Sequence, residues 1–135
     1  MVKNKKKKGC DAERELQHMF WKEGWACVRV AGSGSTRHPS PDIIASNGKY
    51  ILAIEIKVIN SFYKYIKKEQ VDELKEFSKK FGAQPWIAIK FKRKPWMFIS
   101  VEDMKETTKG YVIDIDKGNI VGLKFEELIK LLEDI

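Results

Sequence analysis

The sequence lacks the features that mark membrane proteins and disulfide-stabilised secreted proteins. No apolar run approaches the roughly 20 residues of a membrane-spanning helix. The lysine-rich start has no apolar core of the kind that signal peptides carry. The two cysteines, Cys10 and Cys27, match neither a zinc-binding spacing nor a disulfide framework. We therefore expect one soluble domain in a reducing cytoplasm, as the length of 135 residues also suggests.

Histidine is scarce, and acidic residues are missing from the first ten positions. His38 has no histidine near it except His18, so we do not predict a histidine metal site. Residues 1–10 contain five lysines and no acid: Lys3, Lys5, Lys6, Lys7 and Lys8. The whole chain has 26 basic and 19 acidic residues, so the rest of the chain keeps 21 basic against 19 acidic residues.

The uneven charge predicts a flexible basic arm over residues 1–8, followed by a single domain over 9–135. Such an arm suits phosphate contacts that depend on salt and ignore sequence. The alternative is a tail that only aids solubility. Further basic clusters around Lys64 and Lys67, and at Lys90 to Lys94, favour a nucleic-acid partner.

The stretch from Pro41 to Lys57 is the most informative part of the chain. Asn47-Gly48 between alternating apolar runs predicts two strands joined by a two-residue type I′ turn. With the turn there, Asp42 lies opposite Ala53 and shares one face of the ribbon with Glu55 and Lys57, because side chains alternate along a strand. Two carboxylates and one lysine thus meet on an otherwise apolar hairpin.

This combination favours metal-assisted phosphodiester hydrolysis. Close carboxylates raise each other's pKa unless a cation lies between them, and Mg²⁺ accepts one or two carboxylates together with water and substrate phosphate. The metal can activate a water molecule, and a lysine can orient that water or stabilise developing charge. The simpler alternative is an edge strand with an ion pair and no chemistry.

The remaining segments predict an α/β sandwich with a central mixed β-sheet flanked by helices. Periodicity and turn residues predict helices over 9–23, 68–81 and 125–133, strands over 25–30, 84–91 and 96–100, a helical turn over 101–105, and a hairpin of 111–115 with 119–123. Residues 62–66 are predicted as either a DNA-facing rim or a short paired segment. Glu13 falls at the border of the first helix's apolar stripe, and Arg29 lies within the first strand. The small-residue loop 31–40 leads directly to Asp42, and Ser33 or Ser35 could donate a hydrogen bond to phosphate.

Large aromatic side chains exceed what one small core needs. Trp21 falls opposite the core stripe of its helix, and we expect some of the others to form a subunit interface, where aromatic residues are enriched. The candidates are Phe77, Phe81, Trp86 and Trp96.

One ordered set of residues resembles a known nuclease family. In chain order the set is Glu13-Arg14, Arg29, the loop 31–35, Pro41-Asp42 and Glu55-Ile56-Lys57. This set is similar to the pattern of the archaeal-type Holliday junction resolvases, small members of the PD-(D/E)xK nuclease superfamily, which share their fold with type II restriction enzymes. The similarity extends from Gly9 through the helix that ends at Gly82 and the strands beyond. It implies a restriction-endonuclease-like fold and a homodimer that makes paired symmetric cuts in a four-way junction.

The resemblance also assigns roles to residues. It implies that Glu13, Asp42 and Glu55 bind Mg²⁺ with the Ile56 carbonyl as a further ligand, and that Lys57 is the catalytic lysine. Each dimer would hold two or more metal ions, with Mn²⁺ as an alternative. Ser33 and Ser35 would assist catalysis, and Phe77 and Phe81 would lie at the dimer interface. The residues expected to contact DNA are Arg14, Arg29, Arg37, Lys5, Lys6, Lys7, Lys8, Lys64 and Lys67.

Two other functions stay open at this point. The same chemistry serves nucleases that act on mismatches, flaps or restriction sites, because junction preference depends on dimer geometry. A basic DNA-binding module with an inactive nuclease fold is a third reading, against which the intact Asp42, Glu55 and Lys57 argue. The resemblance places the protein in archaeal cytoplasm, or in that of a host if the gene is viral. Apart from a second copy, the sequence identifies no partner protein.

Overall fold

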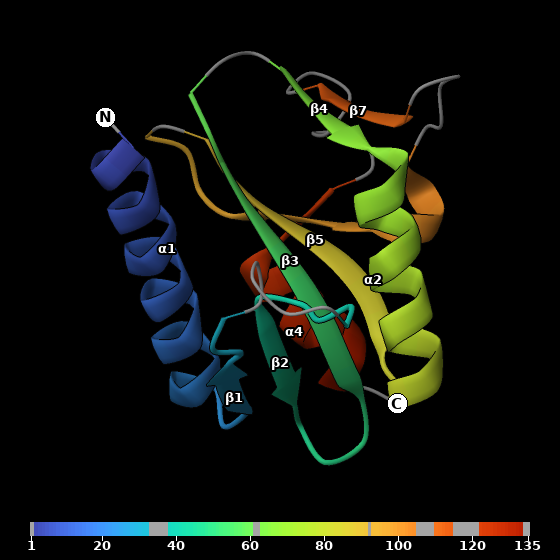
Figure 1. Cartoon of the computed structure of the whole chain (residues 1–135). Helices are drawn as coiled ribbons and strands as arrows, with labels where there is room; N and C mark the ends of the chain where they lie inside the picture. The colour runs from blue at the N-terminus through green and yellow to red at the C-terminus, as the bar shows by residue number, and fades with distance from the viewer. Residues whose placement is uncertain are drawn as a thin grey trace.

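A computed structural model describes residues 2–32, 38–60, 63–91, 93–104, 110–114 and 122–133 (Figure 1). The elements follow in this order: α1 (Val2–Lys22), β1 (Ala26–Arg29), β2 (Ile43–Ser46), β3 (Ile51–Ile59), β4 (Tyr63–Lys67), α2 (Lys68–Phe81), β5 (Gln84–Phe91), β6 (Met97–Ser100), the 3₁₀ turn η1 (Val101–Asp103), β7 (Gly110–Asp114), β8 (Leu123–Lys124) and α4 (Phe125–Glu133). No helix among these residues is long and apolar enough to cross a membrane.

A six-stranded mixed sheet forms the centre of the molecule, with the strand order β1-β2-β3-β5-β6-β8. The central pair, β3 and β5, is parallel, and the other four pairings are antiparallel. Strands buried on both faces have nearly continuous apolar sequences, and β3 and β5 show this pattern. The predicted α/β sandwich with a central mixed sheet is confirmed.

Helices cover both faces of this sheet. On one face, α1 and α4 pack through Leu16, Phe20 and Leu128 against side chains such as Ile54. Burying one such side chain stabilises a fold by about 1.5–3 kcal/mol. On the other face, α2 packs through its apolar stripe, which includes Val71, against Ala53 and other residues. Figure 1 shows α1 and α2 on opposite sides of β3, with α4 behind the sheet.

The second helix was predicted at its observed bounds because both ends are signalled locally. Val71 and Leu74 recur at helical spacing and are buried. Gly82 follows with φ 81°, a left-handed conformation that ends helices and that glycine adopts without steric cost. The Gly82 amide donates to the Ser78 carbonyl at 2.9 Å and closes the helix.

The first helix is longer than predicted. It begins at Val2 rather than at residue 9, so the backbone of the lysine-rich segment continues the helix. Lysine is a good helix former, and charge alone does not distinguish an extended arm from a solvated helical turn. Whether residues 1–8 act as a basic arm on a domain spanning 9–135 stays a prediction.

The predicted register of the β2–β3 hairpin was wrong by two residues. Ile44 lies opposite Ala53 rather than Ile51, and the connection is longer than the predicted two-residue turn. Among its residues Gly48 has a positive φ and Asn47 has not. The Asn47 side chain instead accepts hydrogen bonds from the backbone amides of Lys49, at 2.9 Å, and Tyr50, at 2.8 Å, which is an Asx turn. An even shift keeps every side chain on its predicted face, whereas a shift of one residue would have reversed them all.

Two predictions about the C-terminal half also require correction. The expected hairpin of 111–115 with 119–123 is not formed by the described residues, because β7 pairs with β4 and Leu123 in β8 pairs with β6. Residues 115–121 lie outside the described residues.

The prediction of a short paired segment near residues 62–66 is confirmed, because β4 pairs with β7. Trp86 and Trp96 belong to the core rather than to a surface, with 6% and 4% of their area exposed.

Candidate active site

The candidate site lies at the N-terminal end of β2. Strand β2 begins at Ile43, whereas β3 continues along β5 as far as Ile59. At this point three hydrogen bonds to backbone groups of neighbouring segments fix Asp42. Its amide donates to Ile54 O at 3.1 Å, its carbonyl accepts from Val30 N at 2.9 Å, and its Oδ2 accepts from Ile56 N at 2.8 Å. The Asp42 carboxylate therefore takes the place of a backbone acceptor in the sheet.

Glu55 and Lys57 lie beside Asp42 on the face of β3 that α2 covers. Lys57 Nζ is 3.8 Å from Glu55 Oε2, and the two side chains keep 17% and 23% of their area exposed. Burial, and then the charge of Asp42, raises the pKa of Glu55 to about 8, and Lys57 opposes this rise. A hydrogen bond with Asp42 and the charge of Glu13 make smaller contributions to this rise. The predicted convergence of Asp42, Glu55 and Lys57 is thus present in the structure.

Glu13 and Arg29 approach from the other face of the sheet. Glu13 comes from α1 and Arg29 from the end of β1, and Arg29 Nε donates to Glu13 Oε1 at 3.2 Å. Burial, followed by the charge of Asp42, raises the pKa of Glu13, and the Arg29 guanidinium lowers it. Because Glu13 interacts electrostatically with both Asp42 and Glu55, all three carboxylates share one electrostatic environment.

The side chains of these acids are not arranged as a complete set of metal ligands in the structure. Within the described ranges, no group of three or more His, Cys, Asp or Glu side chains is arranged to hold a metal ion. The chemistry of the donors is still suited to a hard cation, because two carboxylates close enough to share a hydrogen bond are stabilised by positive charge between them. Mg²⁺ needs only one or two protein carboxylates.

The other predicted site residues are more scattered. Arg14 is exposed, pairs with Asp11 at 3.6 Å and interacts electrostatically with Glu13. Lys67 is exposed at the end of β4. The structure describes the backbone of Lys5 to Lys8 in α1 and of Lys64 in β4 but not their side chains. Ser33, Ser35 and Arg37 lie outside the described residues.

One neighbour of the site was not found from the sequence. Gln70, in the first turn of α2, accepts a hydrogen bond from Lys57 Nζ at 3.5 Å. A single glutamine among the other polar residues of a helix matches no sequence motif that would indicate a role in the site. Only the packing of α2 beside β3 brings Gln70 to Lys57.

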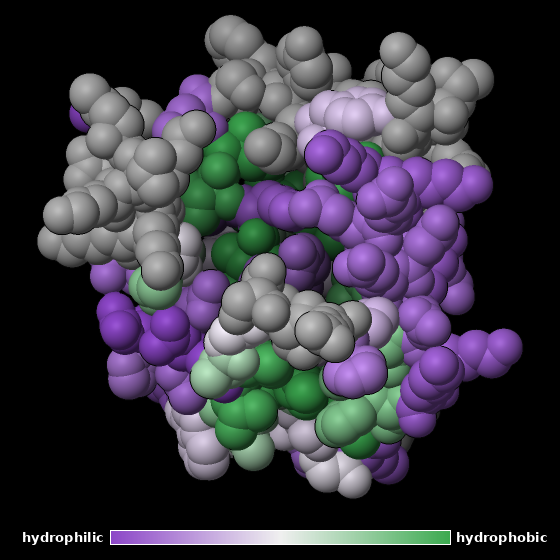
Figure 2. All heavy atoms as spheres, in the orientation of Figure 1, coloured by the Kyte–Doolittle hydropathy of each residue, from purple (hydrophilic) through white to green (hydrophobic). Residues whose placement is uncertain are grey.

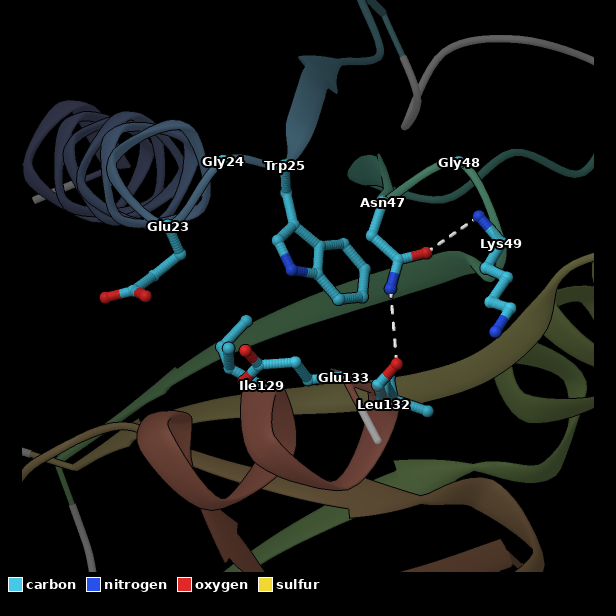
Figure 3. Close-up of a pocket in the computed structure, with 9 residues that line it drawn as sticks. All are labelled: Glu23, Gly24, Trp25, Asn47, Gly48, Lys49, Ile129, Leu132 and Glu133. Atoms are coloured by element: carbon cyan, nitrogen blue, oxygen red, sulfur yellow. Dashed lines mark hydrogen bonds between the residues drawn. The ribbon is translucent and has the colours of Figure 1, made fainter. Parts of the chain in front are cut away.

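Figure 2 shows the surface around this site. Hydrophilic side chains lie in a hollow over β3, with the hydrophilic side of α2 beside it and hydrophobic side chains deeper in. A second cavity, of about 520 Å³, lies away from the acids, at the β2–β3 turn and the C-terminal part of α4 (Figure 3). Trp25 lines it, and Asn47 Nδ2 donates across it to Leu132 O at 3.3 Å. This hydrogen bond connects the β2–β3 turn to α4. Among the described residues that line the cavity, none is a candidate catalytic residue.

The predicted interface phenylalanines lie side by side at the end of α2. The rings of Phe77 and Phe81 stack with centroids 5.0 Å apart, and Phe81 is 49% exposed. Phe77 is half-buried against the core beneath α2. Both line a cavity of about 340 Å³ together with His38 and Pro39, which belong to the segment leading to Asp42.

A solved structure with the same architecture identifies the fold class. The crystal structure of Hjc from Archaeoglobus fulgidus, described as a Holliday junction resolvase from an archaeal hyperthermophile, superposes with a TM-score of 0.81. The match has 38% sequence identity and covers 87% of this chain and 96% of that one. The chain therefore has an α/β nuclease fold.

Sequence comparisons narrow this class to one family. The family model for the archaeal Holliday junction resolvase (Hjc) matches residues 4–135. The Archaeoglobus fulgidus crossover junction endodeoxyribonuclease Hjc is 42% identical over 90% of this chain and 95% of its own length. The Hjc of Methanocaldococcus jannaschii is 35% identical, over 95% and 91%. The Saccharolobus solfataricus crossover junction endodeoxyribonuclease Hje is 34% identical, over 93% and 89%. The chain belongs to the archaeal Holliday junction resolvase family.

Proposed function

We propose that this chain is a metal-dependent endodeoxyribonuclease that resolves four-way DNA junctions by paired, symmetric phosphodiester hydrolysis. The observation that carries the proposal is the convergence of Asp42, Glu55 and Lys57 beside the open end of β2. The relatives named crossover junction endodeoxyribonuclease match nearly the whole chain, which supports the same substrate class.

Asp42 and Glu55 would hold Mg²⁺, with Glu13 and the Ile56 carbonyl as further ligands. When bound, the metal supplies a polarised water and neutralises charge on the phosphate. Burial, and then the charge of Asp42, raises the pKa of Glu55, and backbone hydrogen bonds hold Asp42 in place beside it. A bound cation would stabilise both carboxylates in the ionised form. Mn²⁺ has the same oxygen-ligand preference, and two sites in a dimer imply at least two ions.

Lys57 supplies the positive charge that the protein itself brings to the reaction. Its ammonium group lies 3.8 Å from Glu55 Oε2, and the side chain as a whole is only partly exposed. There it orients the attacking water and stabilises the charge that develops on the phosphate oxygens. The water oxygen would form the new P–O bond and release a proton to solvent, while the other P–O bond breaks and its leaving oxygen takes a proton from solvent. Arg29, held by Glu13, is the candidate for contact with the scissile phosphate.

DNA binding is proposed to rest on backbone phosphates rather than on bases. Arg14 is exposed on α1 and interacts electrostatically with Glu13, and Lys67 is exposed on β4. The lysines of residues 1–8 add a cationic arm to the domain. Such contacts neutralise phosphates without reading sequence, which suits a junction recognised by its shape. A DNA-processing role and two free cysteines favour the cytoplasm.

We propose a homodimer that associates through Phe77 and Phe81. Phe81 is 49% exposed and stacks on Phe77 beside a cavity that Glu76 and Lys80 also line, and aromatic side chains are enriched at interfaces. A second copy is the partner that the reaction requires, because a two-fold dimer places identical sites on the symmetric strands of a junction. One site on a monomer cannot cut both strands together.

Digestion of a labelled four-way junction beside a linear duplex of the same sequence tests this function. The account predicts cleavage of two opposing strands of the junction in Mg²⁺, no cleavage in EDTA, and little cleavage of the duplex. Equal cleavage of the duplex would show that the four-way junction is not the preferred substrate. Binding without cleavage in any divalent metal would show an inactive DNA-binding module.

A further inference from the structure

The first turn of α2 brings a polar side chain to the catalytic lysine. Gln70 Oε1 accepts a hydrogen bond from Lys57 Nζ at 3.5 Å, across the boundary between α2 and β3. We propose that Gln70 is a positioning residue, which holds the Lys57 ammonium over the acidic site. The proposal rests on the function proposed above, since Lys57 has no catalytic task otherwise.

Lys57 needs such a partner because its side chain is long and flexible. Fixing a lysine side chain costs about 2 kcal/mol of rotamer entropy. Its ammonium group has contacts on two sides, Glu55 Oε2 at 3.8 Å and Gln70 Oε1 at 3.5 Å. The two acceptors come from different elements, so together they restrict the ammonium more than either does alone.

The two acceptors differ in what happens to them during the reaction. Glu55 is a proposed metal ligand, so its carboxylate is shared with a cation in the active enzyme. Gln70 lies on α2 and carries no charge, so its carbonyl oxygen stays available to Lys57. A neutral acceptor also avoids a further carboxylate beside Glu55, whose pKa is already raised by burial and then by the charge of Asp42.

The position of Gln70 in its helix leaves its amide free for this contact. Gln70 is the third residue of α2, where a glutamine often reaches back to the N-cap residue in a capping box. That motif needs a serine or threonine at the N-cap, whereas α2 has Lys67 there, and Lys67 makes no side-chain cap hydrogen bond. A capping box therefore does not account for the presence of glutamine at position 70.

Kinetics of matched variants test the proposal in the full-length protein. Gln70→Met keeps the length of the side chain but removes the amide oxygen. It should lower the single-turnover cleavage rate at saturating junction about tenfold, the usual scale for a residue that orients a catalytic group. The junction Kd and the Tm should stay unchanged. Asp72→Asn, which changes an exposed residue on the opposite side of the same helical turn, should leave the rate, Kd and Tm unchanged.

Side-chain dynamics give a readout that does not depend on cleavage. The ¹⁵N order parameter of the Lys57 ammonium, assigned with Lys57→Arg, should fall in Gln70→Met and return in Gln70→Glu, which restores an acceptor oxygen. An unchanged order parameter and an unchanged rate in Gln70→Met would overturn the proposal. A loss of junction affinity with an unchanged saturating rate would also overturn it, by making Gln70 a DNA contact. If the wild-type protein cleaves no junction, the proposed function fails while the order parameters still test the contact.

Discussion

The Asp42 carboxylate accepts a hydrogen bond of 2.8 Å from the backbone amide of Ile56. This bond crosses from the segment before β2 to the middle of β3, and it fixes one acid against the strand that carries Glu55 and Lys57. Asp42 is therefore part of the sheet as well as part of the site. A substitution at residue 42 must be designed to separate these two roles.

Loss of either acid should abolish cleavage and leave junction binding intact. Asp42→Ala and Glu55→Ala each remove a proposed metal ligand, while the basic side chains proposed to contact phosphate are unchanged. Cleavage in Mg²⁺ should fall to background, and gel-shift affinity in Ca²⁺ should stay within about twofold.

Asp42→Asn is the matched variant for stability. Its amide oxygen can still accept from Ile56, so its Tm should stay closer to wild type than that of Asp42→Ala, which leaves that amide unpaired at a cost of about 1–3 kcal/mol. The assigned site would be wrong if Asp42→Asn or Glu55→Ala kept near-normal cleavage in Mg²⁺.

The metal-free protein should lose stability as pH rises from about 4.5 to about 8. Burial, and then the charge of Asp42, raises the pKa of Glu55 to about 8 from 4.5, so in this range the folded protein binds a proton that the unfolded chain has released. The stabilisation is complete below pH 4.5 and is lost as pH passes the folded value. One pKa unit corresponds to about 1.4 kcal/mol, so the loss is of the order of a few kcal/mol.

Urea unfolding in EDTA at several pH values measures this loss. Glu55→Gln should flatten the dependence, and Mg²⁺ should reverse the loss at pH 8 because it binds the ionised acids. An identical pH dependence in wild type and Glu55→Gln would show that Glu55 does not hold the extra proton.

Neutralising the basic arm should weaken DNA binding and flatten its salt dependence without removing cleavage. Replacing Lys5 to Lys8 by glutamine is cleaner than deleting residues 1–8, because α1 begins at Val2 and glutamine preserves the helix. Each lost phosphate contact lowers the slope of log affinity against log salt by about 0.9. Lys130→Gln, on the exposed side of α4, is the control. An unchanged slope would show that the arm does not touch phosphate.

A charge at Phe81 should dissociate the proposed dimer. Phe81 is 49% exposed, so Phe81→Asp removes interface area and its stacking with Phe77, which contributes about 0.5–1.5 kcal/mol, while the core beneath stays intact. Paired incision should fall more than single nicking, because each site keeps its chemistry.

Leu131→Asp is the matched control for this variant. Leu131 is 50% exposed and also lies on a helix, but on α4 rather than α2. It should leave the mass from light scattering unchanged. A wild-type protein that is monomeric at micromolar concentration, with and without DNA, would contradict the dimer.

Local signals were enough to predict the central elements and the face that carries the acids. The bounds of α2 followed from Val71, Leu74 and Gly82, and the shared face of Asp42, Glu55 and Lys57 followed from the period of two. The face on which each side chain lies was predicted correctly despite the error in register, because the shift was an even number of residues. That error came from reading Asn47-Gly48 as a two-residue turn, when the Asn47 side chain holds a longer one.

Contacts between distant segments were beyond the reach of local signals. The pairing of β7 with β4 joins segments separated by a helix, two strands and the 3₁₀ turn η1, whereas the sequence pattern suggested a nearer partner at 119–123. Trp96 was expected at a surface, but it is buried. Its indole Nε1 donates a hydrogen bond to Glu15 on α1 at 2.9 Å, so the polar N–H of the ring is satisfied inside the protein. Gln70 comes close to Lys57 only through the packing of α2 against β3.

The central claim is paired, metal-dependent cleavage by two copies of the Asp42–Glu55–Lys57 site. A supercoiled plasmid that extrudes a cruciform tests this claim most directly, because two cuts within one binding event give linear DNA and single cuts give a nicked circle. The account predicts linear product from the wild-type protein in Mg²⁺, no product in EDTA, and none from Glu55→Gln. Nicked circle alone from the wild type, or equal cleavage of a plasmid without the cruciform, would contradict it.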